Sequence, residues 1–138
     1  LNDGRVFADF VKNALNKEKI MINSDGKAVR CFCYISDAVA GILKITSLGL
    51  AGNAYNLANT NEELSIKELA EIIDRTSGNN LGTILIKDNE NDGYMKSPFK
   101  RLIPKIDKVS ELGWEPQVNT YEGFSRTIKW YRDVCGMN

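Results

Sequence analysis

The chain has 138 residues, enough for one domain with its own hydrophobic core. Hydrophobic residues make up 43% and charged residues 26%, a globular balance that argues against disorder along the whole chain. The 18 basic and 18 acidic side chains cancel, so no nucleic-acid partner is expected. The absence of histidine excludes Ser-His-Asp and Cys-His catalysis and His-ligated zinc.

No apolar run reaches the ~18 residues of a membrane span. The chain starts Leu-Asn-Asp-Gly-Arg, with neither an initiating Met nor a signal peptide. We therefore expect a cytoplasmic chain without a membrane partner, and a fragment or a processed form. Cys31 and Cys33 form a C-x-C pair, which is neither a redox nor a zinc motif. We favour buried, reduced thiols there, and a metal or disulfide role is the alternative.

The chain begins with a predicted helix and two predicted strands. Apolar pairs spaced by four residues predict a helix over 5–16, with Asp3 as its N-cap. Short apolar runs predict strands over 20–22 and 29–35. The polar residues 23–26 between the two strands end in glycine and predict a turn.

The next predicted helix covers 37–48. Ser36 or Asp37 is the expected N-cap, and Gly49 is the expected stop. The spacing predicts that this helix buries four apolar side chains, which are Val39, Ile42, Leu43 and Ile45.

A short strand over 54–57 and a polar loop over 59–63 precede a third helix over 66–76. Ser65 and Glu68 have the spacing of a capping box, in which each side chain accepts a hydrogen bond from the other residue's backbone amide. The residues of this helix expected in the core are Ile66, Leu69, Ile72 and Ile73.

The last third predicts a strand over 83–86, a long loop over 87–101 and a short helix over 107–112. Thr120 is the expected cap of a final helix. Alternating strands and helices predict an α/β or α+β fold. The apolar side chains of the final helix step by three and four, and they are Tyr121, Phe124, Ile128, Tyr131 and Cys135.

Motifs for catalysis and metal binding are missing from the sequence. It has no G-x-G-x-x-G, no P-loop and no Y-x-x-x-K, so no catalytic residue is predicted. The carboxylate pairs Glu62/Glu63 and Glu90/Asp92 lack the spacing of a metal loop and are expected to be solvated.

Arg30 is the most informative charge, because it lies within an apolar strand. It could be an edge residue with its head group in water or a clamp for an anion, and spacing alone favours the first. The loop residues Lys96, Lys100 and Arg101 could close over a phosphate or could simply be solvated.

Five short motifs occur in a recognisable order. They are Asn-Asp-Gly-Arg-Val at 2–6, Val-Arg-Cys-Phe-Cys-Tyr-Ile-Ser-Asp at 29–37, Tyr-Asn-Leu-Ala-Asn at 55–59, Leu-Ser-Ile-Lys-Glu-Leu-Ala at 64–70 and Leu-Gly-Trp-Glu-Pro at 112–116. In this order they resemble the C-terminal part of the NAD-dependent epimerase/dehydratase family. These are extended short-chain dehydrogenases that act on nucleotide sugars, and the resemblance is strongest to UDP-glucuronate decarboxylases and UDP-sugar 4-epimerases.

The resemblance implies that residues 1–138 form one C-terminal substrate-binding domain, with short strands and about five helices. The NAD-binding Rossmann domain would lie upstream, outside this chain. The chain alone would then bind no NAD and catalyse nothing, whereas the intact enzyme would use NAD and form a homodimer. The alternative is a natively short module that binds a nucleotide or a protein.

The resemblance also implies the residues that contact a nucleotide-diphosphate sugar. Arg30 would bind the diphosphate, and either Lys100 or Arg101 would assist it. The remaining candidates would lie along the nucleotide, with Arg5 and Val6 beside it, Met21 and Asn23 at the base, and Asn56 at the nucleotide end of the site.

Overall fold

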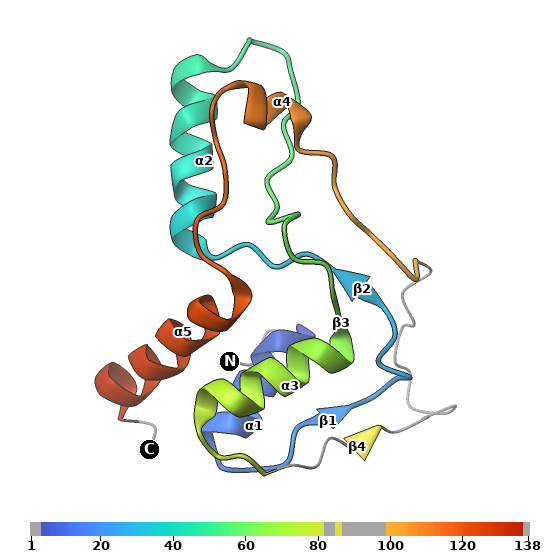
Figure 1. Cartoon of the computed structure of the whole chain (residues 1–138). Helices are drawn as coiled ribbons and strands as arrows, with labels where there is room; N and C mark the ends of the chain where they lie inside the picture. Colours follow the sequence, from blue (N-terminus) through green and yellow to red (C-terminus); the bar gives the residue numbers. More distant parts are fainter. Residues whose placement is uncertain (1–3, 82–84, 87–98, 137–138) are drawn as a thin grey trace.

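The structure is a computed structural model, which describes residues 4–81, 85–86 and 99–136. Helices and very short strands alternate along the chain, which confirms the predicted α/β class. In order they are α1 (Val6–Leu15), β1 (Met21–Ile22), β2 (Val29–Arg30), α2 (Ile35–Leu48), β3 (Leu64–Ser65), α3 (Ile66–Ser77), β4 (Leu85–Ile86), α4 (Asp107–Glu111) and α5 (Thr120–Cys135) (Figure 1).

The hydrophobic core lies between α1, α3 and α5, which Figure 1 shows grouped below α2 and α4. Phe10 of α1, Leu69 of α3 and Ile128 of α5 are almost completely buried in it. These helices are amphipathic, so burying their apolar faces against one another provides the main stabilisation of the domain. Residues of α2 are not among the members of this core.

Two pairs of strands flank the core. β1 pairs in parallel with β4, and β2 pairs antiparallel with β3, so that Arg30 lies opposite Leu64. A further parallel bridge joins Val29 to Arg101. β2 is therefore held between two segments that are distant from it in the sequence.

The capping box of α3 is confirmed. The Ser65 hydroxyl accepts a hydrogen bond from the Glu68 amide at 3.2 Å, and the Glu68 carboxylate accepts one from the Ser65 amide at 2.8 Å. Two backbone donors that the helix itself cannot satisfy are thereby paired. These hydrogen bonds also lower the pKa of Glu68.

Several predicted strand ends and caps are wrong. Only two residues of the predicted strand 29–35 form β2, because only these face β3. The predicted strand 54–57 has no regular secondary structure and no strand partner in the described part of the chain. Asn119, not Thr120, caps α5 by accepting a hydrogen bond from the Glu122 amide.

The start of α1 also differs from the prediction. The helix begins at Val6 and has Arg5 at its N-cap position, without a side-chain cap. Asp3, the predicted cap, lies outside the described residues, as do Glu90, Asp92, Lys96 and most of the long loop. On α5, two of the apolar side chains that step by three and four, Tyr121 and Cys135, are exposed.

The burial predicted for α2 is wrong. Val39, Ile42 and Leu43 are 46%, 55% and 62% exposed, and Ile45 is half-buried. The helix packs on this chain through a different face, at Gly41. A Cβ atom at Gly41 would collide with the Leu57 side chain and come within 2.9 Å of the Trp114 ring nitrogen, so glycine permits this close approach.

The prediction that Asp37 caps α2 is wrong. Its side chain is buried, and one carboxylate oxygen accepts hydrogen bonds from the Gln117 and Val118 amides, each at 2.9 Å. The Trp114 ring nitrogen donates to the Asp37 carbonyl at 2.9 Å. Polar contacts therefore attach α2 to the segment between α4 and α5.

Candidate functional site

Arg30 lies on a ribbon made of three segments. On one side, β3 pairs with β2. On the other, the Val29 amide donates to the Lys100 carbonyl at 2.8 Å, and the Leu102 amide donates to the Val29 carbonyl at 3.2 Å. The backbone that carries Arg30 is thus fixed from both sides.

The Arg30 guanidinium is oriented by backbone carbonyls. Nη1 donates to the Val29 carbonyl at 2.6 Å, and Nη2 donates to the Phe99 carbonyl at 3.0 Å. A guanidinium has five donors in a planar fork that matches phosphate oxygens, so an oriented arginine suits a diphosphate ligand. The side chain is half-buried, which strengthens its electrostatic interactions relative to a fully solvated one.

Pairing across the ribbon distinguishes Lys100 from Arg101. Bridge partners lie on the same face of a sheet, so Arg101 shares the face of Val29, and successive side chains alternate. Lys100 and Arg30 therefore lie on the opposite face. Arg101 forms an ion pair with Glu63 instead, with N–O distances of 2.6 and 2.8 Å.

The Glu63–Arg101 pair corrects the prediction that Glu63 is simply solvated. Arg101 lowers the pKa of the Glu63 carboxyl, chiefly through the hydrogen bond between them. Glu62 is not simply solvated either, because its carboxylate accepts a hydrogen bond from the Thr120 amide at 2.6 Å and so helps to cap α5. The sequence gives no signal for these partners, which are 38 and 58 residues away.

The thiols of Cys31 and Cys33 are partly buried, not fully buried as predicted. Burial raises the pKa of both thiols, and nearby carboxylates raise it further, with Glu63 acting on Cys31 and Asp37 on Cys33. Cys33 donates a weak hydrogen bond to the Tyr34 carbonyl at 3.7 Å. Both thiols are therefore protonated at neutral pH, which is the unreactive form.

Iodoacetamide labelling at neutral pH is expected to modify Cys135 before Cys31 and Cys33, because Cys135 is exposed. Peptide mass spectrometry over a time course would measure the three rates. The unfolded chain in urea is the control, and there the three rates should converge. Equal rates in the folded chain would contradict the burial of the two inner thiols.

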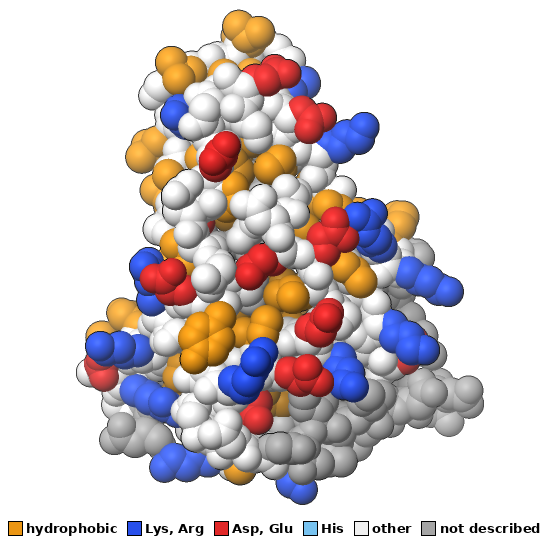
Figure 2. All heavy atoms as spheres, in the orientation of Figure 1, with side chains coloured by type: hydrophobic (Ala, Val, Ile, Leu, Met, Phe, Trp, Pro, Cys, Tyr) orange, Lys and Arg blue, Asp and Glu red, His pale blue; other side chains and the backbone are white. Residues whose placement is uncertain are grey.

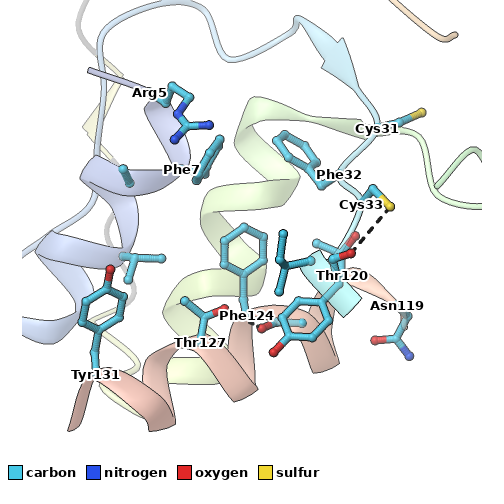
Figure 3. Close-up of a pocket in the computed structure, with 15 residues that line it drawn as sticks. Arg5, Phe7, Cys31, Phe32, Cys33, Asn119, Thr120, Phe124, Thr127 and Tyr131 are labelled. Carbon is cyan, nitrogen blue, oxygen red and sulfur yellow. Dashed lines mark hydrogen bonds between the residues drawn. The ribbon is translucent and has the colours of Figure 1, made fainter. Parts of the chain in front are cut away.

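A cavity of about 700 Å³ opens between α1, α5 and the segment that joins β2 to α2 (Figure 3). At its α1 end, the Arg5 guanidinium lies 4.9 Å from the centre of the Phe7 ring. Phe7 contacts Phe32 edge-to-face at 6.5 Å between ring centres. Arg5 is the only charged residue among the described residues that line the cavity, so an apolar or planar group suits it better than a diphosphate.

The opposite wall of the cavity is the first part of α5. A Cβ atom at Gly123 would lie 3.0 Å from the Tyr34 ring, so glycine lets this ring pack directly against the helix. Arg126 covers the same ring at 5.6 Å from its centre. The hydroxyl of Thr120 is buried and has no hydrogen-bond partner in the described part of the chain.

The remaining predicted site residues are distributed over separate parts of the chain. Val6 is half-buried against the core, Met21 is half-buried on β1, and Asn23 is exposed just after it. The Asn56 amide donates to the Lys105 carbonyl at 3.0 Å. The structure thus puts Lys100 on the segment that pairs with β2 and places Arg5 at the cavity. Asn56 lies elsewhere, because its side chain contacts the segment that contains Lys105.

The described residues contain neither a candidate membrane span nor a candidate metal site. No helix there has the length and apolar character needed to cross a membrane. No cluster of three or more Cys, Asp or Glu residues there has the arrangement of a metal site.

The chain is similar to known proteins in both its sequence and its fold. Residues 1–58 match the NAD dependent epimerase/dehydratase family. UDP-glucuronic acid decarboxylase 2 of Arabidopsis thaliana is 35% identical over 133 residues, which cover 96% of this chain and 28% of that protein.

Two solved structures show the same fold. UDP-glucose 4-epimerase of Thermotoga maritima, solved with UDP-glucose, superposes with a TM-score of 0.78 at 25% identity and covers 95% of this chain and 40% of its own. The Bordetella bronchiseptica enzyme WbmF, in complex with NAD+ and UDP, gives a TM-score of 0.74 at 27% identity over 96% of this chain and 37% of its own.

These similarities confirm the family resemblance predicted from the sequence, which is to the NAD-dependent epimerase/dehydratase family. The chain spans a little over a quarter of the Arabidopsis decarboxylase and about two fifths of the Thermotoga epimerase.

Proposed function

We propose that this chain binds the nucleoside-diphosphate part of a nucleotide sugar, with Arg30 as the diphosphate clamp. The observation that carries the proposal is the oriented guanidinium on a doubly paired backbone. The similarity to a UDP-glucuronic acid decarboxylase and to a UDP-glucose 4-epimerase supports UDP as the nucleotide.

Lys100 is the proposed second cation at the diphosphate. It lies on the same face of the ribbon as Arg30, while Arg101 is occupied by Glu63 on the other face. Arg5 and Val6 are proposed beside the nucleotide. The contacts from Arg5 to Phe7 and from Phe7 to Phe32 support this, because they bring the start of α1 close to the segment that follows Arg30.

The base is proposed to rest near Met21 and Asn23, with Asn56 toward the nucleotide end. In the complete enzyme, an NAD-binding part would supply the cofactor and the catalytic residues. This chain would supply affinity and position the sugar, and positioning of this kind accounts for much of an enzyme's rate enhancement. We further propose that the complete enzyme is a cytoplasmic homodimer and that this chain alone has no turnover.

Titration of the chain with UDP by isothermal calorimetry tests the proposal. Arg30→Ala is expected to weaken UDP binding roughly 10- to 100-fold, because hydrogen bonds from a charged donor contribute about 1.5–3 kcal/mol. Arg126→Ala is the control, since it removes an arginine from α5, outside the ribbon, that pairs with Glu122. Wild-type chain that does not bind UDP, or an Arg30→Ala chain that binds as tightly as wild type, would contradict the proposal.

The same titration separates the two loop cations. Lys100→Ala is expected to weaken UDP binding severalfold, since one exposed charge contributes less than the clamp, while Arg101→Ala leaves it nearly unchanged. The reverse order would show that the pairing of the ribbon does not determine which cation meets the diphosphate.

A further inference from the structure

The cavity between α1 and α5 has the size and the lining of a small-molecule site. Its volume is about 700 Å³, within the range of roughly 300–1,000 Å³ that ligand pockets span. Figure 2 shows hydrophobic side chains at the surface in the region where α5 lies beside α1 in Figure 1, with charged side chains around them. An aromatic ligand suits this lining, because aromatic rings pack well edge to face. The four rings that line the cavity are those of Phe7, Phe32, Phe124 and Tyr131.

The two sides of the cavity differ in polarity. Arg5 is exposed, and its guanidinium lies 4.9 Å from the centre of the Phe7 ring, so it places a positive charge at the mouth. Thr120 is 4% exposed, so its hydroxyl lies in the interior. Figure 3 shows Arg5 and Thr120 on opposite sides of the cavity. An anionic group fits the first side, and a group that forms hydrogen bonds fits the second.

The Thr120 hydroxyl takes no part in the contacts that hold the start of α5. Its Oγ1 atom is buried and has no hydrogen-bond partner among the described residues. The backbone amide of Thr120 donates to the Glu62 carboxylate at 2.6 Å, and the side chain of Asn119 caps the helix. Buried polar groups almost always have a partner, because an unpaired one lowers the stability of the fold. The hydroxyl is therefore placed to serve a ligand in the cavity.

We infer that the cavity is a second binding site, which takes an aromatic carboxylate with a hydroxyl group at the other end of its ring system. The rings pack against Phe32 and Phe124, the carboxylate lies near Arg5, and the hydroxyl shares a hydrogen bond with Oγ1 of Thr120. Arg30 is not among the described residues that line the cavity, so this site is distinct from the proposed diphosphate clamp. The inference goes beyond the proposed function and does not depend on it.

Fluorescence titration of the 138-residue chain with 6-hydroxy-2-naphthoate tests the site, because this compound carries a carboxylate and a hydroxyl at opposite ends of a fused ring. Thr127→Phe is expected to weaken binding roughly tenfold, because Thr127 lines the cavity and a phenyl ring would fill part of it. Thr46→Phe is the matched control on α2. Thr46 is exposed, and its hydroxyl, like that of Thr127, donates to the carbonyl four residues earlier. Wild type that does not bind, or equal Kd values for the two variants, would overturn the inference.

Thr120→Val tests the hydroxyl while it keeps the shape of the side chain. Wild type is expected to bind 6-hydroxy-2-naphthoate about fivefold more tightly than 2-naphthoate, which lacks the hydroxyl. Thr120→Val should bind the two compounds equally, and it should bind 2-naphthoate as tightly as wild type does. Its midpoint of urea denaturation should be no lower than that of wild type, since the hydroxyl has no described partner to lose. A preference that persists in Thr120→Val, or a lower midpoint, would overturn the assignment of this hydroxyl to a ligand.

UDP added to the same titrations separates the cavity from the proposed nucleotide site. Saturating UDP is expected to raise the Kd of 6-hydroxy-2-naphthoate less than about threefold, because Arg5, an exposed charge, is the one residue that the two proposed sites share. A larger, competitive increase would show that the cavity is part of the nucleotide site and would overturn the inference. A chain that binds the naphthoate but not UDP contradicts only the proposed function. A chain that binds UDP but not the naphthoate contradicts only this inference.

Discussion

Replacing Asp37 with alanine is expected to lower the free energy of unfolding by about 2–4 kcal/mol, because two charge-assisted hydrogen bonds are lost. The side chain is 6% exposed, and its carboxylate accepts from the amides of Gln117 and Val118. Alanine would leave both amides without their partner, and the Val118 amide is buried, where an unpaired donor is costly. Urea denaturation followed by circular dichroism would measure the change.

Asp37→Asn is the informative companion variant. The amide oxygen can still accept a hydrogen bond but carries no charge, so the loss of stability should be clearly smaller than for alanine. A third variant, Asp107→Ala, controls for removing an exposed acidic residue from a helix. An Asp37→Ala chain as stable as wild type would show that these two hydrogen bonds do not hold α2 in place.

Replacing Trp114 with alanine is expected to lower the free energy of unfolding by about 3–5 kcal/mol, as for other large aromatic side chains in a core. Trp114 is 3% exposed, contacts Gly41 and donates a hydrogen bond to the Asp37 carbonyl. Trp114→Phe keeps most of the packing and loses the hydrogen bond, so it should cost less. Urea denaturation followed by circular dichroism suits both variants.

The double variant of Asp37 and Trp114 tests whether the two residues act together. Both hold α2 against the segment between α4 and α5, so their effects should be non-additive, with an interaction energy of roughly 0.5–3 kcal/mol. Strict additivity would show that the two residues stabilise the protein independently of each other.

Local features of the fold could be predicted because they depend on near neighbours. The capping box at Ser65 and Glu68 needs only residues three apart, and its side chains are placed as predicted. The apolar faces of α1 and α3, which supply most of the core residues, could be predicted for the same reason. Apolar side chains at helical spacing lie on one face of a helix wherever that helix packs.

Features that depend on distant partners could not be predicted. The side chains of Val39, Ile42 and Leu43 on α2 have the spacing of a core face. Only the fold shows that they are exposed among the described residues. The acceptor role of Asp37 needs amides 80 and 81 residues away. The family resemblance singled out Arg30, but the distinction between Lys100 and Arg101 depends on the bridge from Val29 to the 99–102 segment.

The proposal that Arg30 and its ribbon bind a nucleoside diphosphate is tested most directly by nuclear magnetic resonance of the ¹⁵N-labelled chain during a titration with UDP. The account predicts shift changes at the amides of Arg30 and Lys100 and at those of Met21 and Asn23, with smaller changes for uridine, which lacks the diphosphate. Changes confined to the cavity wall on α5, or equal changes with uridine, would contradict it.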